Sequence, residues 1–161
     1  MTSPENLKGL SKKTLTWLTV LAIVGLAISW VQTFHYFEVR SGQAGFNSFC
    51  QVGARFDCNA IDASPYAELI AGLPLAAAAA GWFLAILVLT LLARSAEFSG
   101  VVYPWVLGMT GFGSLMSLGY LGVMVGVLKV GCLLCLGVDT VNFSLFAILF
   151  LNRPKNKVAS N

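Results

Sequence analysis

The stretch LPLAAAAAGWFLAILVLTLLA, residues Leu73–Ala93, contains 21 residues and no charged side chain. A helix rises about 1.5 Å per residue, so a stretch of this length crosses the roughly 30 Å of hydrocarbon in a bilayer. Three further stretches share this character: Thr14–Phe34 with 21 residues, Val101–Leu128 with 28 and Val130–Leu151 with 22. Together they predict an all-α membrane protein, a bundle of four transmembrane helices.

The composition of the whole chain agrees with this prediction. Of 161 residues, 57% are hydrophobic and 11% are charged, against about 25% charged in ordinary soluble domains. The net charge of +3 is mild. These values argue against a soluble globule, a disordered chain and a basic nucleic-acid-binding domain. The first apolar run is longer than that of a signal peptide and no clear cleavage site follows it, so we expect a retained helix.

The positive residues predict the orientation of the bundle, because they concentrate on the cytoplasmic side. With the N-terminus inside, seven lie on the inner face and three on the outer face. The inner group is Lys8, Lys12, Lys13, Arg94, Arg153, Lys155 and Lys157, and the outer group is Arg40, Arg55 and Lys129. This predicts a cytoplasmic tail at 1–13, a membrane domain at 14–151 and a second cytoplasmic tail at 152–161.

Residues 35–72 then form a long loop on the outer face. Within it, Ser64 followed by Pro65 is typical of a helix N-cap with proline at the first helical position. Gly72 and Pro74 are typical of a helix end. We therefore expect a short surface helix over Pro65–Ala71.

Four cysteines fall at this outer face in two pairs, Cys50 with Cys58 in the loop and Cys132 with Cys135 at the start of the last span. Only an oxidising compartment outside the cytosol tolerates stable disulfides. The Cys-Leu-Leu-Cys spacing places both sulfurs on one helix face, near an N-terminus that stabilises a thiolate. The two pairs predict a relay by thiol–disulfide exchange. The alternatives are a zinc site, which would need both pairs, and inert buried cysteines.

This set of motifs resembles the vitamin K epoxide reductase family. The motifs are Cys50-x7-Cys58, then Ser64, then Gly72-Leu73-Pro74, and finally Cys132-x-x-Cys135. The resemblance covers about residues 14–151, and Ser64-Pro65-Tyr66 is similar to bacterial members. It implies a four-helix bundle that holds a quinone near the outer membrane face, in a bacterial inner membrane with the active site facing the periplasm.

The resemblance also implies roles for individual residues. Cys50 and Cys58 would take electrons from a thioredoxin-like partner, and Cys58 would pass them to Cys132. Cys135 would lie nearest to a quinone of the ubiquinone or menaquinone (vitamin K) type, with no metal involved. Ser64 matches a loop serine thought to assist the cysteines. Because the chain has no fused thioredoxin-like domain, the partner would be a separate, DsbA-like protein.

Asp139 and Asn142 follow the last cysteine pair inside the fourth span. Asp139 shares the face of Cys135, and an ionisable residue in a span is a candidate functional group. We assign both residues to quinone binding, with Asp139 as a possible proton donor; the alternative is that they hold helices together by hydrogen bonds. Asp139 stands where mammalian members carry a tyrosine. His35, the single histidine, is expected to be an interfacial polar residue.

The sequence thus predicts a quinone-dependent thiol–disulfide oxidoreductase that promotes disulfide formation in exported proteins, with the lipid bilayer as its environment. Two alternatives remain. One is a vitamin K reductase in a recycling role, and the other is a non-enzymatic membrane protein that binds soft metal ions through its thiols.

Overall fold

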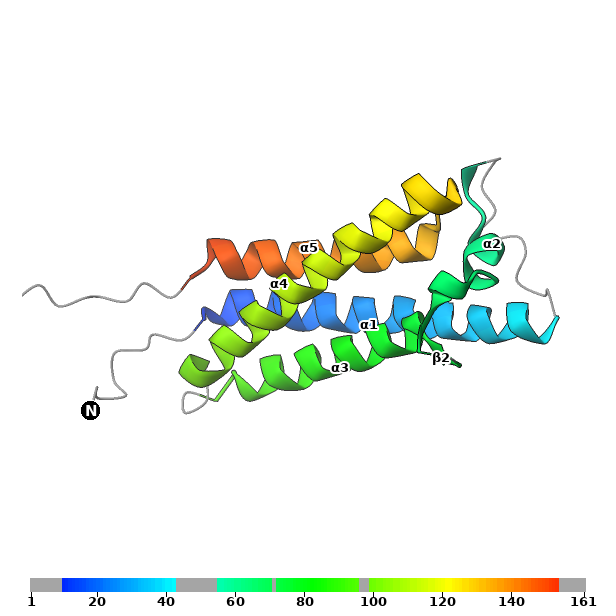
Figure 1. Cartoon of the computed structure of the whole chain (residues 1–161). Coiled ribbons are helices and arrows are strands. Elements are labelled where there is room, and N and C mark those ends of the chain that lie inside the picture. Colours follow the sequence, from blue (N-terminus) through cyan, green and yellow to red (C-terminus); the bar gives the residue numbers. More distant parts are fainter. Residues whose placement is uncertain (1–9, 43–54, 71, 96–98, 154–161) are drawn as a thin grey trace, which may run out of the picture.

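The protein is a bundle of long helices, seen in a computed structural model that describes residues 10–42, 55–70, 72–95 and 99–153. Its long elements are α1 (Lys12–Ser41), α3 (Leu75–Leu92), α4 (Ser99–Val123) continued by the π turn η4 (Met124–Leu128), and α5 (Leu133–Leu151) (Figure 1). Four helices in the described chain are long and apolar enough to cross a membrane. The predicted all-α bundle is therefore confirmed.

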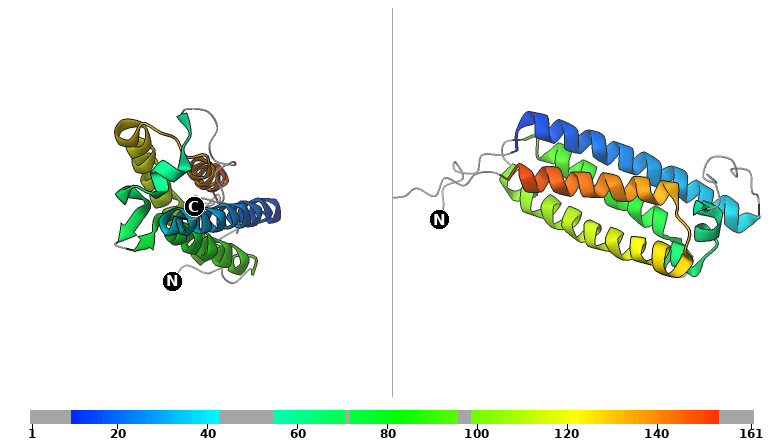
Figure 2. Two further views of the ribbon diagram at one scale, coloured as in Figure 1. Left: turned by 90° about the vertical axis from the view of Figure 1, so that its right-hand side faces the viewer. Right: turned by 90° about the horizontal axis from the view of Figure 1, so that it is seen from above.

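The short elements gather at one end of this bundle. They are α2 (Cys58–Asp62), the 3₁₀ turn η3 (Pro65–Ala67), and two strands, β1 (Glu68–Ile70) and β2 (Leu73–Pro74), which pair antiparallel. Figure 2 shows the start of α1 and the end of α5 together at the opposite end. Both ends of the described chain thus lie on the same side, as four consecutive spans require.

The first helix is longer than the apolar run that predicts it. The side chain of Ser11 caps its start by accepting the N–H of Thr14 at 3.1 Å, and Gly42 ends it with a φ of 74°. The last turns extend beyond the predicted span because they bind the loop. Glu68 accepts hydrogen bonds from Tyr36 at 2.8 Å and from Arg40 at 2.6 Å.

The loop differs from its prediction. Instead of a helix over 65–71, a single 3₁₀ turn leads into the β1–β2 hairpin. Ser64 is the N-cap residue of this turn and Pro65 follows it, as predicted, but the Ser64 side chain makes no capping hydrogen bond. Its hydroxyl donates to the carbonyl of Ile61 at 2.6 Å. Glu68 closes the hairpin by accepting the N–H of Gly72 at 3.0 Å, where φ is 84°. That N–H, aided by the Tyr36 hydroxyl, holds the pKa of Glu68 below its ordinary value.

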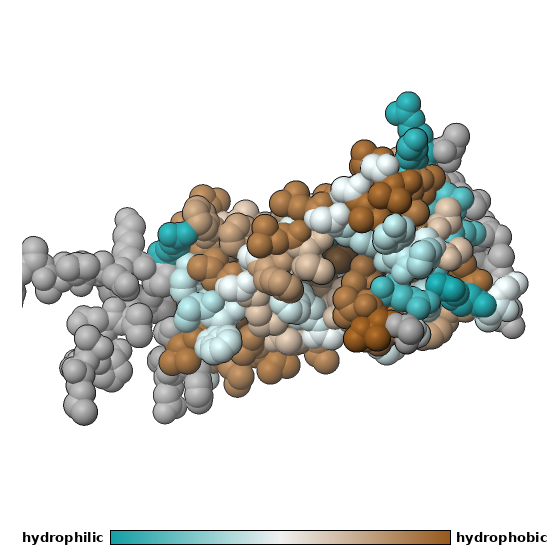
Figure 3. Space-filling model, viewed as in Figure 1, coloured by the Kyte–Doolittle hydropathy of each residue, from teal (hydrophilic) through white to brown (hydrophobic). Residues whose placement is uncertain are grey.

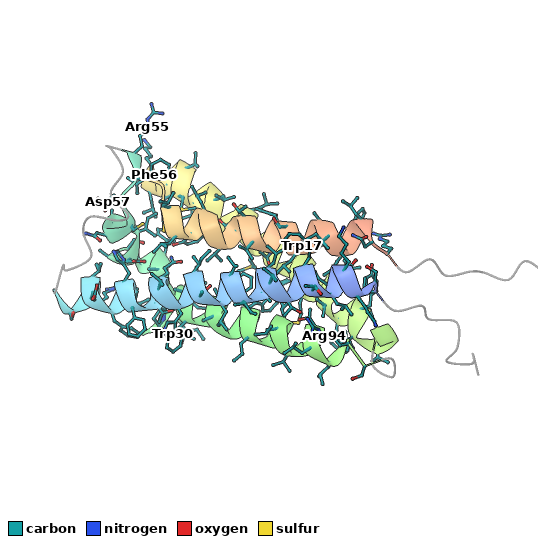
Figure 4. The ribbon with its side chains drawn as sticks, turned by 180° about the vertical axis from the view of Figure 1, so that it is seen from behind. Trp17, Trp30, Arg55, Phe56, Asp57 and Arg94 are labelled. Carbon is teal, nitrogen blue, oxygen red and sulfur yellow. A yellow bond between two sulfur atoms is a disulfide. The ribbon has the colours of Figure 1, made fainter. Side chains whose placement is uncertain are left out.

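The core lies between the helices and the outer surface is apolar. Leu18, Phe83, Ile86 and Leu145 are buried in one cluster. Large apolar side chains cover the length of the bundle, and hydrophilic ones gather toward its ends (Figure 3). Trp17 and Trp30 are both more than half exposed on α1 (Figure 4). Such a surface suits lipid rather than water, and the chain is a multi-pass membrane protein.

The helices α1 and α3 approach each other closely at Gly25, and this contact gives a test of the packing. A Cβ atom there would lie 2.5 Å from two ring carbons of the buried Phe83. We expect Gly25→Ala to lower the free energy of unfolding by about 1–3 kcal/mol, because an overpacked core must distort. Denaturant unfolding in detergent measures this change.

Gly81→Ala on α3 is the matched control, since a Cβ atom there meets nothing within 4 Å. Equal stability of the two variants would contradict the packing described here.

Candidate redox site

The redox site begins with a backbone contact between two distant segments. The N–H of Gly131 donates to the carbonyl of Arg55 at 2.9 Å, and the N–H of Asp57 donates to the carbonyl of Gly131 at 3.0 Å. Figure 4 shows Arg55, Phe56 and Asp57 at the end of the bundle where α5 begins. A Cβ atom on Gly131 would lie 2.8 Å from the ring of Phe56, so glycine permits this approach.

This contact brings three of the four cysteines together. The Sγ atoms of Cys58 and Cys132 lie 3.5 Å apart, and Cys132 forms a disulfide with Cys135. All three residues are buried. The sequence analysis also assigned Cys50 to the site, and that residue lies outside the described part of the chain.

The two sulfurs of the Cys132–Cys135 disulfide have different surroundings. Cys132 is the N-cap of α5, and its Sγ accepts the backbone N–H of Cys135 at 3.1 Å. Cys135 lies in the first turn of the helix, where its Sγ accepts a hydrogen bond from Nε2 of Gln32 at 3.0 Å. The expected position of the pair at a helix N-terminus is therefore observed.

Gln32 was not among the site residues predicted from the sequence. An uncharged polar side chain inside an apolar span was the available signal. Its α1 helix packs against α5, which carries Cys135.

A cavity of about 450 Å³ opens beside the disulfide, and its lining includes Cys135, Asp139 and Asn142. Its other walls are mainly apolar side chains of α3 and α4, among them Ala76, Phe83, Phe112 and Met116. Both residues that were predicted to bind quinone, Asp139 and Asn142, thus line the same cavity as Cys135.

Among the described residues, each of these two has one buried oxygen without a hydrogen-bond partner. Asn142 donates from Nδ2 to the carbonyl of Thr110 at 3.3 Å and to Ser114 Oγ at 3.2 Å, which ties α5 to α4. The oxygens without a partner in the described part of the chain are Oδ1 of Asn142 and Oδ2 of Asp139. A buried polar atom without a partner is costly, so both atoms are suited to bind a polar group of a ligand.

His35 is not the interfacial residue that the sequence suggested. Its side chain is buried, and its Nδ1 lies 2.5 Å from Oδ2 of the buried Asp62. This contact ties the end of α1 to α2, next to Cys58. Burial raises the pKa of Asp62, and the hydrogen bond from His35 opposes that rise. Ser64, another predicted site residue, lies just beyond and bonds the end of the same helix.

A helical membrane bundle with a buried disulfide, a third cysteine in contact with it and an adjacent apolar cavity defines a membrane-embedded redox protein. Comparison with family models agrees, since residues 16–150 match the model of the vitamin K epoxide reductase family. No curated protein matches the sequence. The chain therefore belongs to the vitamin K epoxide reductase family, an oxidoreductase family associated with quinone and vitamin K substrates.

The buried Asp62 predicts a dependence of stability on pH. Its folded-state pKa is raised above the ordinary 3.8, so stability is lost as the pH rises from that value through the folded pKa. Asp62→Asn removes this titration. The unfolding temperature of the variant relative to the wild type should therefore increase as the pH is raised over this range, then level off. Thermal unfolding in detergent at a series of pH values measures it, and a constant difference would contradict the prediction.

Proposed function

We propose that this protein is a quinone-linked thiol–disulfide oxidoreductase. It takes electrons from a separate thioredoxin-like, DsbA-like protein, passes them to a membrane quinone, and so promotes disulfide formation in exported proteins. One observation carries this proposal. Cys58 Sγ lies 3.5 Å from Cys132 Sγ, and the disulfide partner of Cys132, Cys135, lines the cavity.

The proposed relay begins with two exchanges. The partner's thiolate attacks Cys50 of an oxidised Cys50–Cys58 pair, and Cys58 leaves as a thiolate. Cys58 then attacks Cys132, since reacting atoms about 3–3.5 Å apart are close to an attack geometry, and Cys135 leaves as a thiolate. Two further exchanges complete the transfer: the partner's second thiolate releases Cys50, and the Cys50 thiolate attacks Cys58 and releases Cys132. Each exchange forms one S–S bond and breaks another, so electrons move inward without a net change in the number of disulfides.

The cavity fits a quinone as the final acceptor. Apolar walls suit its ring and tail. The protonated carboxyl of Asp139 suits a carbonyl oxygen of the quinone, and Asn142 Oδ1, an acceptor, suits a hydroxyl of the reduced quinol. A bound quinone of the ubiquinone or menaquinone type would accept two electrons and two protons. Asp139, when protonated, donates a proton from its carboxyl oxygen, and Asn142 Oδ1 accepts a hydrogen bond from a hydroxyl. Ser64 supports the turn that holds Cys58.

We also propose that the protein lies in a bacterial inner membrane, with the cysteines facing the periplasm and both termini in the cytoplasm. Support comes from the placement of charge. Lys12, Lys13, Arg94 and Arg153 belong to the ends of the helices on the side away from the cysteines. The periplasm is oxidising, as a disulfide relay requires.

The relay predicts a trapped intermediate in the Cys135→Ser variant. Without Cys135, the Cys132 thiolate attacks Cys58 of the oxidised Cys50–Cys58 pair and Cys50 leaves as a thiolate. No Cys135 thiol is then present to resolve the Cys58–Cys132 mixed disulfide, so we expect it to accumulate in most of the molecules. Thiol trapping in cells followed by mass spectrometry of the linked peptides detects it. Cys58→Ser is the matched control and should abolish the linkage. Free thiols at both positions in the Cys135→Ser variant would contradict the relay.

The role of Asp139 predicts slower quinone reduction in the Asp139→Asn variant. General acid catalysis contributes roughly 10²–10⁴-fold, so we expect turnover to fall by about 100-fold while the bundle remains folded. The assay follows reduction of ubiquinone-1 by purified protein with dithiothreitol as reductant, with vitamin K epoxide as the competing acceptor. Turnover of the variant equal to that of the wild type at every pH would rule out the proton-donor role.

A further inference from the structure

We infer that Gln32 is a catalytic residue of the relay, because its amide stabilises the sulfur of Cys135 at the moment when the Cys132–Cys135 bond breaks. This inference rests on the proposed function, since it concerns one step of that relay. It assigns the residue a task that the cysteines themselves cannot perform.

The geometry separates the two sulfurs of the disulfide. Cys58 Sγ lies 3.5 Å from Cys132 Sγ, which makes Cys132 the sulfur that is attacked. Gln32 Nε2 lies 3.0 Å from Cys135 Sγ and 4.0 Å from Cys132 Sγ. The attacking sulfur and the amide donor are therefore close to different atoms of the same S–S bond.

This arrangement determines where the negative charge goes during the exchange. The Cys58 thiolate forms a bond to Cys132 Sγ, and the Cys132–Cys135 bond breaks. The electron pair of that bond, and the negative charge that Cys58 carried, remain on Cys135 Sγ. No proton is gained or lost. A negative charge thus appears inside the bundle, on the sulfur of Cys135. This residue is only 4% exposed, so little water can solvate the charge.

The amide of Gln32 is placed to meet that charge. A sulfur in a disulfide is a weak acceptor, whereas a hydrogen bond to a charged group is about twice as strong as a neutral one. The contact in the oxidised state is therefore weak, and it strengthens as the thiolate forms. An interaction that strengthens along the reaction lowers the barrier rather than only binding the ground state.

Within the described residues, no backbone N–H is hydrogen-bonded to the Cys135 sulfur. At the start of α5, the N–H of Cys135 itself is directed to Cys132 Sγ at 3.1 Å. Gln32 comes from a different helix, α1, and this residue is only 8% exposed. Burying a long polar side chain costs conformational entropy and solvation, and a weak bond to a disulfide offsets little of that cost. A strong hydrogen bond to the Cys135 thiolate that forms during the reaction accounts for the buried amide better than the weak bond to the disulfide does.

The test compares Gln32→Met, which keeps the length of the side chain and removes the donor, with Gln32→Asn, which draws the amide back by one methylene. We expect kcat for ubiquinone-1 reduction, with dithiothreitol as reductant, to fall by about 10-fold to 100-fold in both variants. Gln32 also lines the cavity, so KM for ubiquinone-1 is measured as well. A rise in KM with kcat unchanged would assign the amide to quinone binding and overturn its role on sulfur. Thr33→Val is the control, since within the described residues the Thr33 hydroxyl donates to the Ser29 carbonyl of its own helix.

A second measurement separates catalysis from structure. In the dithiothreitol-reduced protein, the rate of alkylation of Cys135 by iodoacetamide reports its thiolate. That rate should fall in both Gln32 variants, by the factor seen in kcat, and remain unchanged in Thr33→Val. If one Gln32 variant does not fold, the other decides. Wild-type kcat in a folded variant would overturn the role of Gln32, whereas an inactive wild type would overturn the proposed function.

Discussion

Two backbone hydrogen bonds at Gly131 hold the loop segment Arg55–Asp57 against the start of α5, and the redox site depends on them. Without this contact, Cys58 would belong to a loop with no fixed relation to Cys132. With it, two sulfurs that are 74 residues apart in the sequence come within 3.5 Å. The glycine is required because the Phe56 ring occupies the space that a side chain would need.

A second set of contacts supports the first from the side of α1. This helix continues past the apolar span, so that Tyr36 and Arg40 can bind Glu68 and His35 can bind Asp62. These bonds fix α2, which begins at Cys58, and β1, which follows it, to a rigid helix. The same helix carries Gln32 to Cys135. One long element thus positions both the loop and the amide donor, which explains why it must be longer than a bilayer requires.

The interior of the bundle is asymmetric around the disulfide. On one side, Cys132 faces Cys58 and receives a backbone N–H; on the other, Cys135 faces Gln32 and the cavity with Asp139 and Asn142. Exchange chemistry needs such a difference, because attack on Cys135 would leave the electron pair of the broken bond on Cys132 rather than on the sulfur of the residue that lines the cavity. Close packing of α1 and α5 keeps the two sides distinct.

The four spans were predictable from the sequence because burial in lipid demands long apolar runs, and this demand acts on each helix by itself. The capping position of Cys132-x-x-Cys135 was predictable for a similar local reason. By contrast, the hairpin at Glu68–Pro74, the buried pair of His35 and Asp62, and the contact of Gln32 with Cys135 depend on partners far away in the chain. Local propensity carries no information about such partners, so only the tertiary structure decided them.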